Sequence, residues 1–157
     1  MEYIRAGKEQ IQEIIRLRIA FLEEDFEGVN EENIRAIEGQ LIYYFNEHLN
    51  KDAYVYIAID KEPIGMAILL INQKPANPNF PTGCTGLVMN VYTSKEYRRQ
   101  GVAERLMDML ITHARSLNLD YIELEATPQG YGLYKKLGFE DKVSGNKSMK
   151  LKLGSLI

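Results

Sequence analysis

The spacing of hydrophobic and polar positions divides the chain into helical and extended stretches. Near the start, aliphatic residues recur every three or four positions, which predicts a helix with one buried stripe made of Ile11, Ile14, Ile15, Ile19 and Leu22. Asn30 suits the N-cap of a second helix ending near Leu49, because its side chain can accept a hydrogen bond from the first turn. Tyr3 and Ile4, ahead of both helices, predict a short first strand.

The middle of the chain has the density of β-branched and aromatic residues that strands favour. Residues 54–59 and 64–71, separated by a turn at 60–63, predict a hairpin. A loop with three prolines follows, and such a loop is too rigid and too poor in donors for a strand. Residues 86–93 predict another strand, and their almost wholly apolar character places it in the centre of a sheet.

The last third of the chain alternates between the two patterns again. Apolar spacing over 102–117 predicts a helix of about four turns. Residues 121–126 alternate as a strand does, 130–137 predict a short helix, and 149–153 predict a closing strand. This order of elements predicts an α/β (α+β) fold in one domain over residues 1–157, with helices on both faces of a mixed sheet.

Length, composition and charge narrow the classes of function. A chain of 157 residues has the size of one ordinary domain, and 45% hydrophobic with 26% charged residues is normal for a globular protein. The net charge of -3 argues against a nucleic-acid partner, since phosphate contacts need a basic surface. No apolar run has the length of a membrane span or a signal peptide, so we expect no membrane partner and a cytoplasmic location. The two histidines lack the spacing of metal ligands, and we expect no metal.

The stretch between the apolar strand and the long helix carries the candidate chemistry. A helix N-terminus offers unpaired N–H groups and a partial positive charge. Gly101 lets the backbone approach an anion without a Cβ, and Ala103 keeps the first turn open. Arg98 and Arg99 can add charge-assisted contacts. Neither the Walker spacing nor the dinucleotide-binding spacing of glycines is present, so the stretch predicts a pyrophosphate cradle of a third kind.

Two motifs in this part of the chain resemble those of one family. The sequence Arg98-Arg99-Gln100-Gly101-Val102-Ala103 is similar to the Arg/Gln-x-x-Gly-x-Gly/Ala signature of the GNAT superfamily of N-acetyltransferases. The later sequence Gly132-Leu133-Tyr134-Lys135-Lys136-Leu137-Gly138-Phe139 resembles the family's Leu-Tyr-x-Lys-Leu-Gly-Phe motif. The resemblance is close over 87–139 and extends over the whole chain in the order of elements. It implies a mostly antiparallel sheet whose central parallel strands splay apart.

The resemblance also implies a co-substrate and the residues that bind it. Acetyl coenzyme A is expected in the wedge between the splayed strands, with its pantetheine arm along the earlier strand and its pyrophosphate on the helix start. The implied binding residues are Val91, Tyr92, Thr93, Arg98, Arg99, Gln100, Gly101, Val102, Ala103, Thr127 and Tyr134.

The chemistry implied by the resemblance is direct attack of a neutral primary amine on the thioester in a ternary complex. Tyr134 is then the acid that protonates the leaving thiolate, and a strand amide near Tyr92 stabilises the oxyanion. Many relatives have a Glu early in the central strand, but the matching region here reads Thr85-Gly86-Leu87. Another carboxylate or a chain of waters must therefore take the amine proton, and Glu125 and Asn90 are the candidates for this catalytic role.

The sequence leaves the acceptor and one rival function open. A small cationic amine is favoured by the acidic run 23–27, which we expect in a loop after the first helix, although an ordinary solvated loop explains the run better than a binding surface does. A peptide or protein amino group is the second acceptor class. The rival is a non-catalytic acyl coenzyme A sensor or scaffold: the missing strand Glu leaves room for it, and Tyr134 argues against it. The resemblance suggests a homodimer as a further partner.

Overall fold

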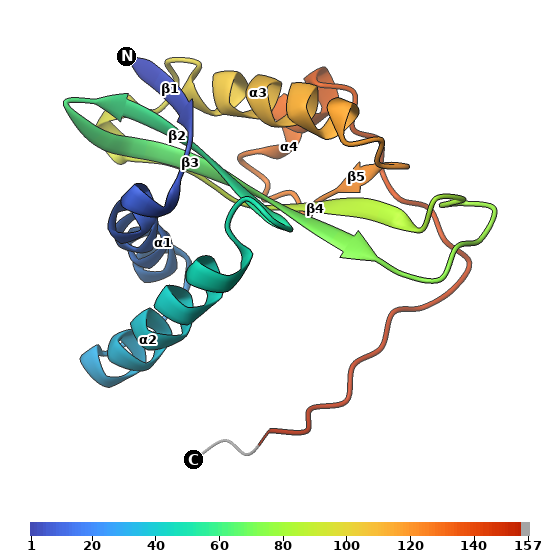
Figure 1. Cartoon of the computed structure of the whole chain (residues 1–157), viewed down its shortest axis with the longest axis horizontal. Coiled ribbons are helices and arrows are strands. Elements are labelled where there is room, and N and C mark those ends of the chain that lie inside the picture. Colours follow the sequence, from blue (N-terminus) through green and yellow to red (C-terminus); the bar gives the residue numbers. More distant parts are fainter. Residues whose placement is uncertain (155–157) are drawn as a thin grey trace. The chain divides into compact units, whose positions relative to one another are not determined.

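The first 125 residues of the computed structural model form a five-stranded sheet with helices on both faces (Figure 1). The structure describes residues 1–154, and the residues from Ala126 onward form a second compact unit. The strands lie in the order β1-β2-β3-β4-β5, with bounds Glu2–Arg5, Ala53–Asp60, Glu62–Gln73, Cys84–Thr93 and Ile122–Glu123. Every pairing is antiparallel except that of β4 with β5.

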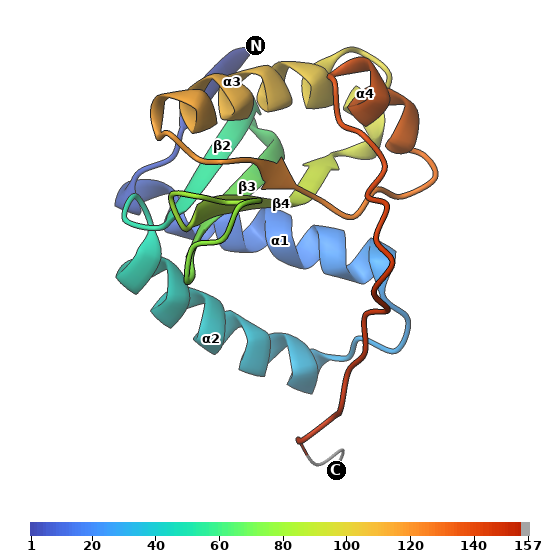
Figure 2. The ribbon, with the colours of Figure 1, turned by 90° about the vertical axis from the view of Figure 1, so that its right-hand side faces the viewer.

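Two helices cover one face of this sheet and a third covers the other (Figures 1 and 2). The helices α1 and α2 lie together on the first face and α3 lies on the second, with bounds Ile11–Asp25, Glu31–His48 and Val102–Ser116. Short 3-10 turns, η1 (Lys8–Gln10) and η2 (Lys95–Tyr97), precede α1 and α3. The stripes predicted from the sequence meet the sheet in a core that includes Ile14, Leu17, Phe45, Val55, Ile57 and Met66. The expected fold class is confirmed.

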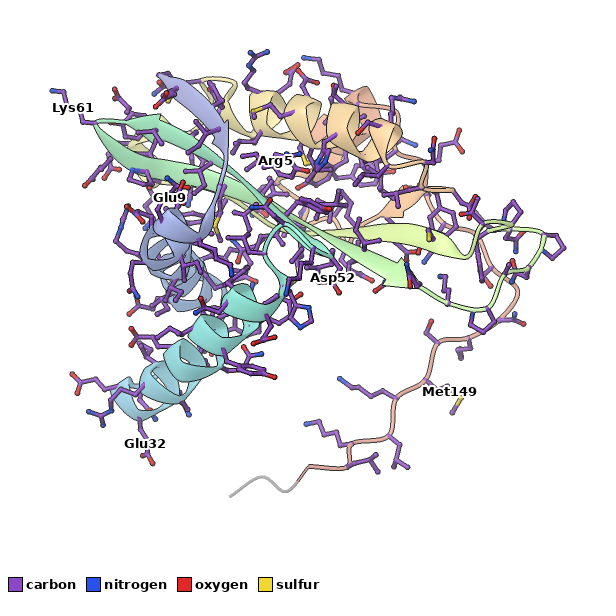
Figure 3. All side chains as sticks on the ribbon, viewed as in Figure 1. Arg5, Glu9, Glu32, Asp52, Lys61 and Met149 are labelled. Carbon is purple, nitrogen blue, oxygen red and sulfur yellow. The ribbon has the colours of Figure 1, made fainter. Side chains whose placement is uncertain are left out.

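The tight turn of the β2–β3 hairpin is at Lys61, whose φ of 68° is the left-handed conformation that such turns require (Figure 3). Helix α1 continues through Asp25, so the first half of the acidic run 23–27 is helical instead of lying in a loop. No helix described within residues 1–154 is long and apolar enough to cross a membrane.

A β-bulge in β4 shapes the centre of the sheet. Tyr92 pairs with Met66 of β3, whereas Met89 pairs with Ile68, so two residues of β4 stand opposite one residue of β3. The first of the two, Asn90, has a φ of 55°. A bulge bends its strand and increases its twist. The parallel pairing with β5 is limited to Gly86 and Leu87 of β4, and the two strands separate beyond that point, as the resemblance predicts.

The described part of the second unit contains one short helix, α4 (Tyr131–Lys136), followed by Gly138 at a φ of 102°. The expected strand at 149–153 is wrong, because the structure gives residues 139–154 no regular secondary structure. The apolar side chains of this segment are exposed. Their exposed fractions are 91% for Met149 (labelled in Figure 3), 82% for Leu151 and 89% for Leu153. An alternating pattern needs a neighbouring strand before it becomes a ladder, and no strand among the described residues pairs with it. Residues 155–157, the end of the predicted single domain, lie outside the described part, and the single domain stays a prediction.

Candidate cofactor and acceptor site

The bulged end of β4 presents backbone groups on the side away from β3. The Ser94 N–H donates to the Ile64 carbonyl at 2.7 Å, so Ser94 faces β3. Because backbone groups in an antiparallel ladder alternate between the two sides of a strand, those of Tyr92 also face β3. The groups of Val91 and Thr93 face the opposite side, where the pairing with β5 has already ended. The amides near Tyr92 that are available to a ligand are therefore those of Val91 and Thr93.

The start of α3 is an open helix N-terminus. Gly101 occupies the N-cap at a φ of 82° and a ψ of 9°, and no side chain caps the helix. A Cβ added to Gly101 would find nothing within 4 Å, so the space in front of the first turn is open. The N–H groups of the first turn, including those of Val102 and Ala103, have no partner within the helix itself. This arrangement suits an anion such as a pyrophosphate.

Local contacts hold this helix start beside the end of β4. Gly65 of β3 makes the close approach possible, because a Cβ there would lie 3.0 Å from the Tyr92 carbonyl oxygen and 3.2 Å from Cγ1 of Val102. The Tyr97 hydroxyl donates to Asp60 at 2.8 Å and ties η2 to the end of β2. The predicted cradle and the outward groups of β4 thus belong to one rigid corner of the first unit.

The two arginines of the predicted cradle have different surroundings. Arg98 donates from Nε to the Thr93 carbonyl at 2.7 Å and from Nη2 to Glu24 at 2.8 Å. Arg99 is exposed at a φ of 61°, and no hydrogen bond or ion pair engages it within the described residues. The Gln100 side chain donates to the Glu96 carbonyl at 3.0 Å. Arg98 therefore holds β4 against α1, while Arg99 is available to a ligand.

An acidic hollow lies beside the same end of β4. It is open, with a volume of about 400 Å³, and it is lined by Ala20, Glu23, Glu24, Tyr92, Ser94, Lys95 and Glu96. Burial and then the nearby Glu24 carboxylate raise the pKa of Tyr92, so this phenol stays neutral. Glu24 also faces Lys95, at 3.8 Å. The remaining carboxylates of the hollow can attract a cation.

Asn90 connects the bulge to α1. Its Oδ1 accepts a hydrogen bond from Nη1 of Arg18 at 2.7 Å. Its Nδ2 and the Thr93 hydroxyl are buried and have no hydrogen-bond partner within residues 1–154. A carboxamide has little basicity, so Asn90 can bind or orient a group but is a poor acceptor for the proton of an amine.

The other predicted site residues lie at the end of the first unit or in the second unit. Glu125 is exposed and is the last residue of the first unit. Thr127 receives the Gly130 N–H at its hydroxyl, 3.1 Å away, and so shapes the turn before α4. Tyr134 is buried, its ring packs edge-on against Phe139 at 5.8 Å, and burial raises its pKa. The phenol of Tyr134 therefore keeps its proton at neutral pH, which an acid requires.

Arg18 is absent from the site predicted from the sequence, although it leaves a signal there, and Glu24 enters that prediction only as part of the acidic run 23–27. Arg18 stands three residues after Ile15 and four before Leu22, which puts a charge on the apolar stripe of α1. A charged residue at a core-facing position is an unusual feature. Nothing in the sequence distinguishes Glu24 from the neighbouring acids of that run, because its pairing with Arg98 depends on the fold. Among residues 1–154, no three His, Cys, Asp or Glu side chains gather as a metal site would need.

Comparison with known proteins identifies the family of the chain. The chain matches the acetyltransferase (GNAT) family over residues 14–139, whereas no curated protein matches it significantly. A protein from Clostridium acetobutylicum, described as a predicted acetyltransferase with acetyl-CoA, is 27% identical, with a TM-score of 0.82 over 96% of this chain and 95% of that one.

More distant structures share the fold alone. An aminoglycoside 6'-N-acetyltransferase from Acinetobacter haemolyticus is 19% identical, with a TM-score of 0.68 over 97% of this chain and 100% of that one. A glucosamine-6-phosphate N-acetyltransferase from Arabidopsis thaliana is 12% identical, with a TM-score of 0.65 over 95% and 99% of the two chains. Since the family match spans most of the chain and the fold agrees with it, the chain belongs to the GNAT family and is an acetyltransferase.

Proposed function

We propose that the protein transfers the acetyl group of acetyl coenzyme A to a primary amine, and that the coenzyme binds along the outward side of β4 and across the start of α3. The observation that carries this proposal is the uncapped start of α3, held beside unpaired backbone groups of β4. Acetyltransferases of this family use acetyl coenzyme A, and the residues present here fit its two polar parts. The outward amides and carbonyls suit the pantetheine arm, and the helix start suits the pyrophosphate.

Each residue of the corner then has a role. Val91 offers its N–H and carbonyl, and Thr93 its N–H, to the pantetheine arm, beside the ring of Tyr92. The amides from Gln100 to Ala103, with the guanidinium of Arg99, bind the pyrophosphate. Arg98 keeps the Thr93 carbonyl and α1 in place. Thr127 and Tyr134, in the second unit, are proposed to complete the coenzyme site.

The chemical step needs an oxyanion donor, an acid and a route for one proton. The amine nitrogen forms a bond to the thioester carbon while the bond from carbon to sulfur breaks. The outward N–H of Val91, next to Tyr92, donates to the carbonyl oxygen as it gains negative charge. Tyr134 protonates the leaving thiolate, and the amine proton leaves through water. Glu125 is exposed and can receive that proton from solvent.

The acceptor is proposed to approach through the acidic hollow. Glu23 and Glu96 line it with carboxylates, and Tyr92 is part of its wall beside the oxyanion donor. A cationic small molecule or a peptide amino group is attracted to such a surface. We further propose that the protein is cytoplasmic and acts as a monomer or as a homodimer.

The function is tested by the release of free coenzyme A thiol across a panel of polyamines, aminoglycosides, amino acids and short peptides. Tyr134→Phe is expected to lower kcat by about a hundredfold or more, with the Kd for acetyl coenzyme A unchanged. Tyr131→Phe is the matched control. Tyr131 lies on the same helix, and the hydroxyl that this change removes donates to Asp141 at the surface.

Acceptor-dependent release with one class of amine names the substrate type. A flat panel with protein that binds the coenzyme favours the sensor or scaffold instead. Normal turnover by Tyr134→Phe removes Tyr134 from the mechanism.

A further inference from the structure

Arg18 of α1 carries a half-buried charge that no acidic side chain neutralises within residues 1–154. Its partners are the Asn90 side-chain oxygen, 2.7 Å from Nη1, and the ring of Phe21, whose centroid is 5.9 Å from Cζ. Burial lowers the pKa of Arg18, as expected of a cation partly removed from water. Holding a charge away from water without a counter-charge is unfavourable, so an anion at this point would stabilise the folded protein.

Asn90 adds an unsatisfied buried donor at the same place. The residue is 6% exposed, and its Nδ2 has no acceptor among the described residues. Its oxygen already accepts from Arg18, so the unsatisfied donor of Asn90 and the guanidinium of Arg18 belong to one connected group. Buried donors without acceptors are rare in folded proteins. A ligand oxygen is the natural group to satisfy them.

Two other arginines show that this situation is particular to Arg18. Arg16, two residues earlier on the same helix, is exposed and donates to the Pro63 carbonyl at 2.7 Å. Arg98 has its charge neutralised by Glu24 at 2.8 Å. Arg18 differs from both because it combines burial with an uncompensated charge.

The position of the pair connects it to the acetyl acceptor. Asn90 directly precedes Val91, and Phe21 packs edge-on against Tyr92 at 6.2 Å. Tyr92 also lines the acidic hollow. The ring of Phe21, which contacts both the Arg18 guanidinium and the Tyr92 ring, therefore connects the donor pair to the hollow, and this favours a ligand with both signs of charge.

We propose, building on the proposed function, that the acceptor carries an oxyanion besides its amine and that Arg18 and Asn90 bind that oxyanion. A carboxylate or a phosphate fits, because either accepts hydrogen bonds from both side chains and neutralises the guanidinium. A neutral carbonyl would satisfy the hydrogen bonds but leave the charge uncompensated. The amine of the same molecule is attracted by the hollow.

Matched pairs of acceptors test the proposal in the thiol-release assay. Amino acids are compared with their carboxamides, and glucosamine-6-phosphate with glucosamine, so that each pair differs in the oxyanion. One charged member is expected to exceed its neutral partner in kcat/KM by about ten- to a hundredfold. Preference for the carboxylate or for the phosphate identifies the source of the oxyanion. Equal rates within every pair, or preference for the neutral members, overturn the proposal.

Variants of α1 show whether Arg18 causes the preference for acceptors with an oxyanion. Arg18→Met keeps an apolar stem and is expected to abolish the preference through KM, with the Kd for acetyl coenzyme A unchanged, and Arg18→Lys should retain part of it. Arg16→Met removes the same charge two residues away and should keep the full preference. A preference that survives Arg18→Met, in protein with the wild-type denaturation midpoint, contradicts the assignment.

A binding measurement separates this proposal from the proposed function. The coenzyme-bound protein is titrated with inorganic phosphate and with acetate while the side-chain amide of Asn90 is followed in 15N NMR spectra. A shift that disappears in Arg18→Met supports the oxyanion site even if no amine is acetylated. No shift with either anion overturns the site even if amines without an oxyanion are acetylated.

Discussion

The starts of α2 and α3 differ in how their first N–H groups are satisfied. At α2, the Asn30 side chain accepts from the Asn33 N–H at 2.9 Å, and Asn33 accepts from the Asn30 N–H at 3.5 Å, which makes a reciprocal cap. Glu31 adds a negative charge in the first turn. At α3, Gly101 contributes no side chain and no cap is made. One helix caps its own start, and the other leaves its start open, where we propose that a ligand binds.

The later parts of the same two helices differ as well. His48, the last residue of α2, pairs with Asp52 at 2.8 Å on an exposed surface. His113 of α3 lies between the Tyr56 hydroxyl, 2.6 Å from Nδ1, and the Arg5 guanidinium, 2.7 Å from Nε2. Figure 3 shows Arg5 on the α3 side of the sheet. Arginine can only donate, so Nε2 is unprotonated and the ring is neutral. The contrast suggests that α3 is fixed near its end and free to bind at its start.

The largest effect on coenzyme binding is expected from closing the open start of α3. Gly101→Asp places a carboxylate in front of the N–H groups of α3 and should weaken acetyl coenzyme A binding by about a hundredfold. Gly28→Asp is the matched control, because Gly28 also has a positive φ, 74°, and open space around it. Both changes should lower stability by about 1 kcal/mol, since both need the left-handed conformation. Equal losses of affinity in isothermal titration would contradict the comparison.

Substitutions of the two arginines before α3 should affect different properties, coenzyme binding in one case and stability in the other. Arg99→Met removes an exposed, unengaged charge and is expected to weaken coenzyme binding about tenfold with little change in stability. Arg98→Met removes the contacts to Thr93 and Glu24 and should cost about 1 kcal/mol, a modest amount because the pair is partly exposed. Titration calorimetry and urea denaturation measure the two quantities. The reverse pattern would make Arg98 the main phosphate ligand.

A change at the capped start of α2 should lower the stability of the protein without changing its affinity for the coenzyme. Asn30→Ala removes the side-chain acceptor for the Asn33 N–H and should lower the free energy of unfolding by about 1 kcal/mol. The Kd for acetyl coenzyme A should stay unchanged, because α2 holds no part of the cradle. A loss of coenzyme affinity in this variant would show that the two helix starts are coupled.

The smallest effect concerns pH. Burial, and then the charge of Arg5, lower the pKa of His113 below its ordinary value. The unfolded chain therefore binds a proton near pH 6.5 that the folded chain binds only at lower pH. The contribution of His113 is complete above pH 6.5 and is lost as the pH falls through the folded pKa, at no more than about 1.4 kcal/mol per pH unit. His113→Gln should flatten this part of the urea-denaturation profile, and a profile as steep as that of the wild type would refute the assignment.

Sequence patterns predict the parts of this protein whose signal is local. The spacing of Val102 and Leu106 identifies α3, and Gly101 marks its open start, because both depend on neighbouring residues. The strand expected at 149–153 is wrong since alternation says nothing of whether a partner strand is present. The bond between Asn90 and Arg18 joins residues 72 positions apart, which no local pattern contains.

The most direct test is an acetyl coenzyme A titration followed in 15N NMR spectra of the wild-type protein. We expect large shifts for the amides of Val91, Thr93, Val102 and Ala103, and none for the amides of Glu31 to Asn33 at the start of α2. Binding that leaves the start of α3 unshifted, or that shifts both helix starts equally, would contradict the proposed coenzyme site.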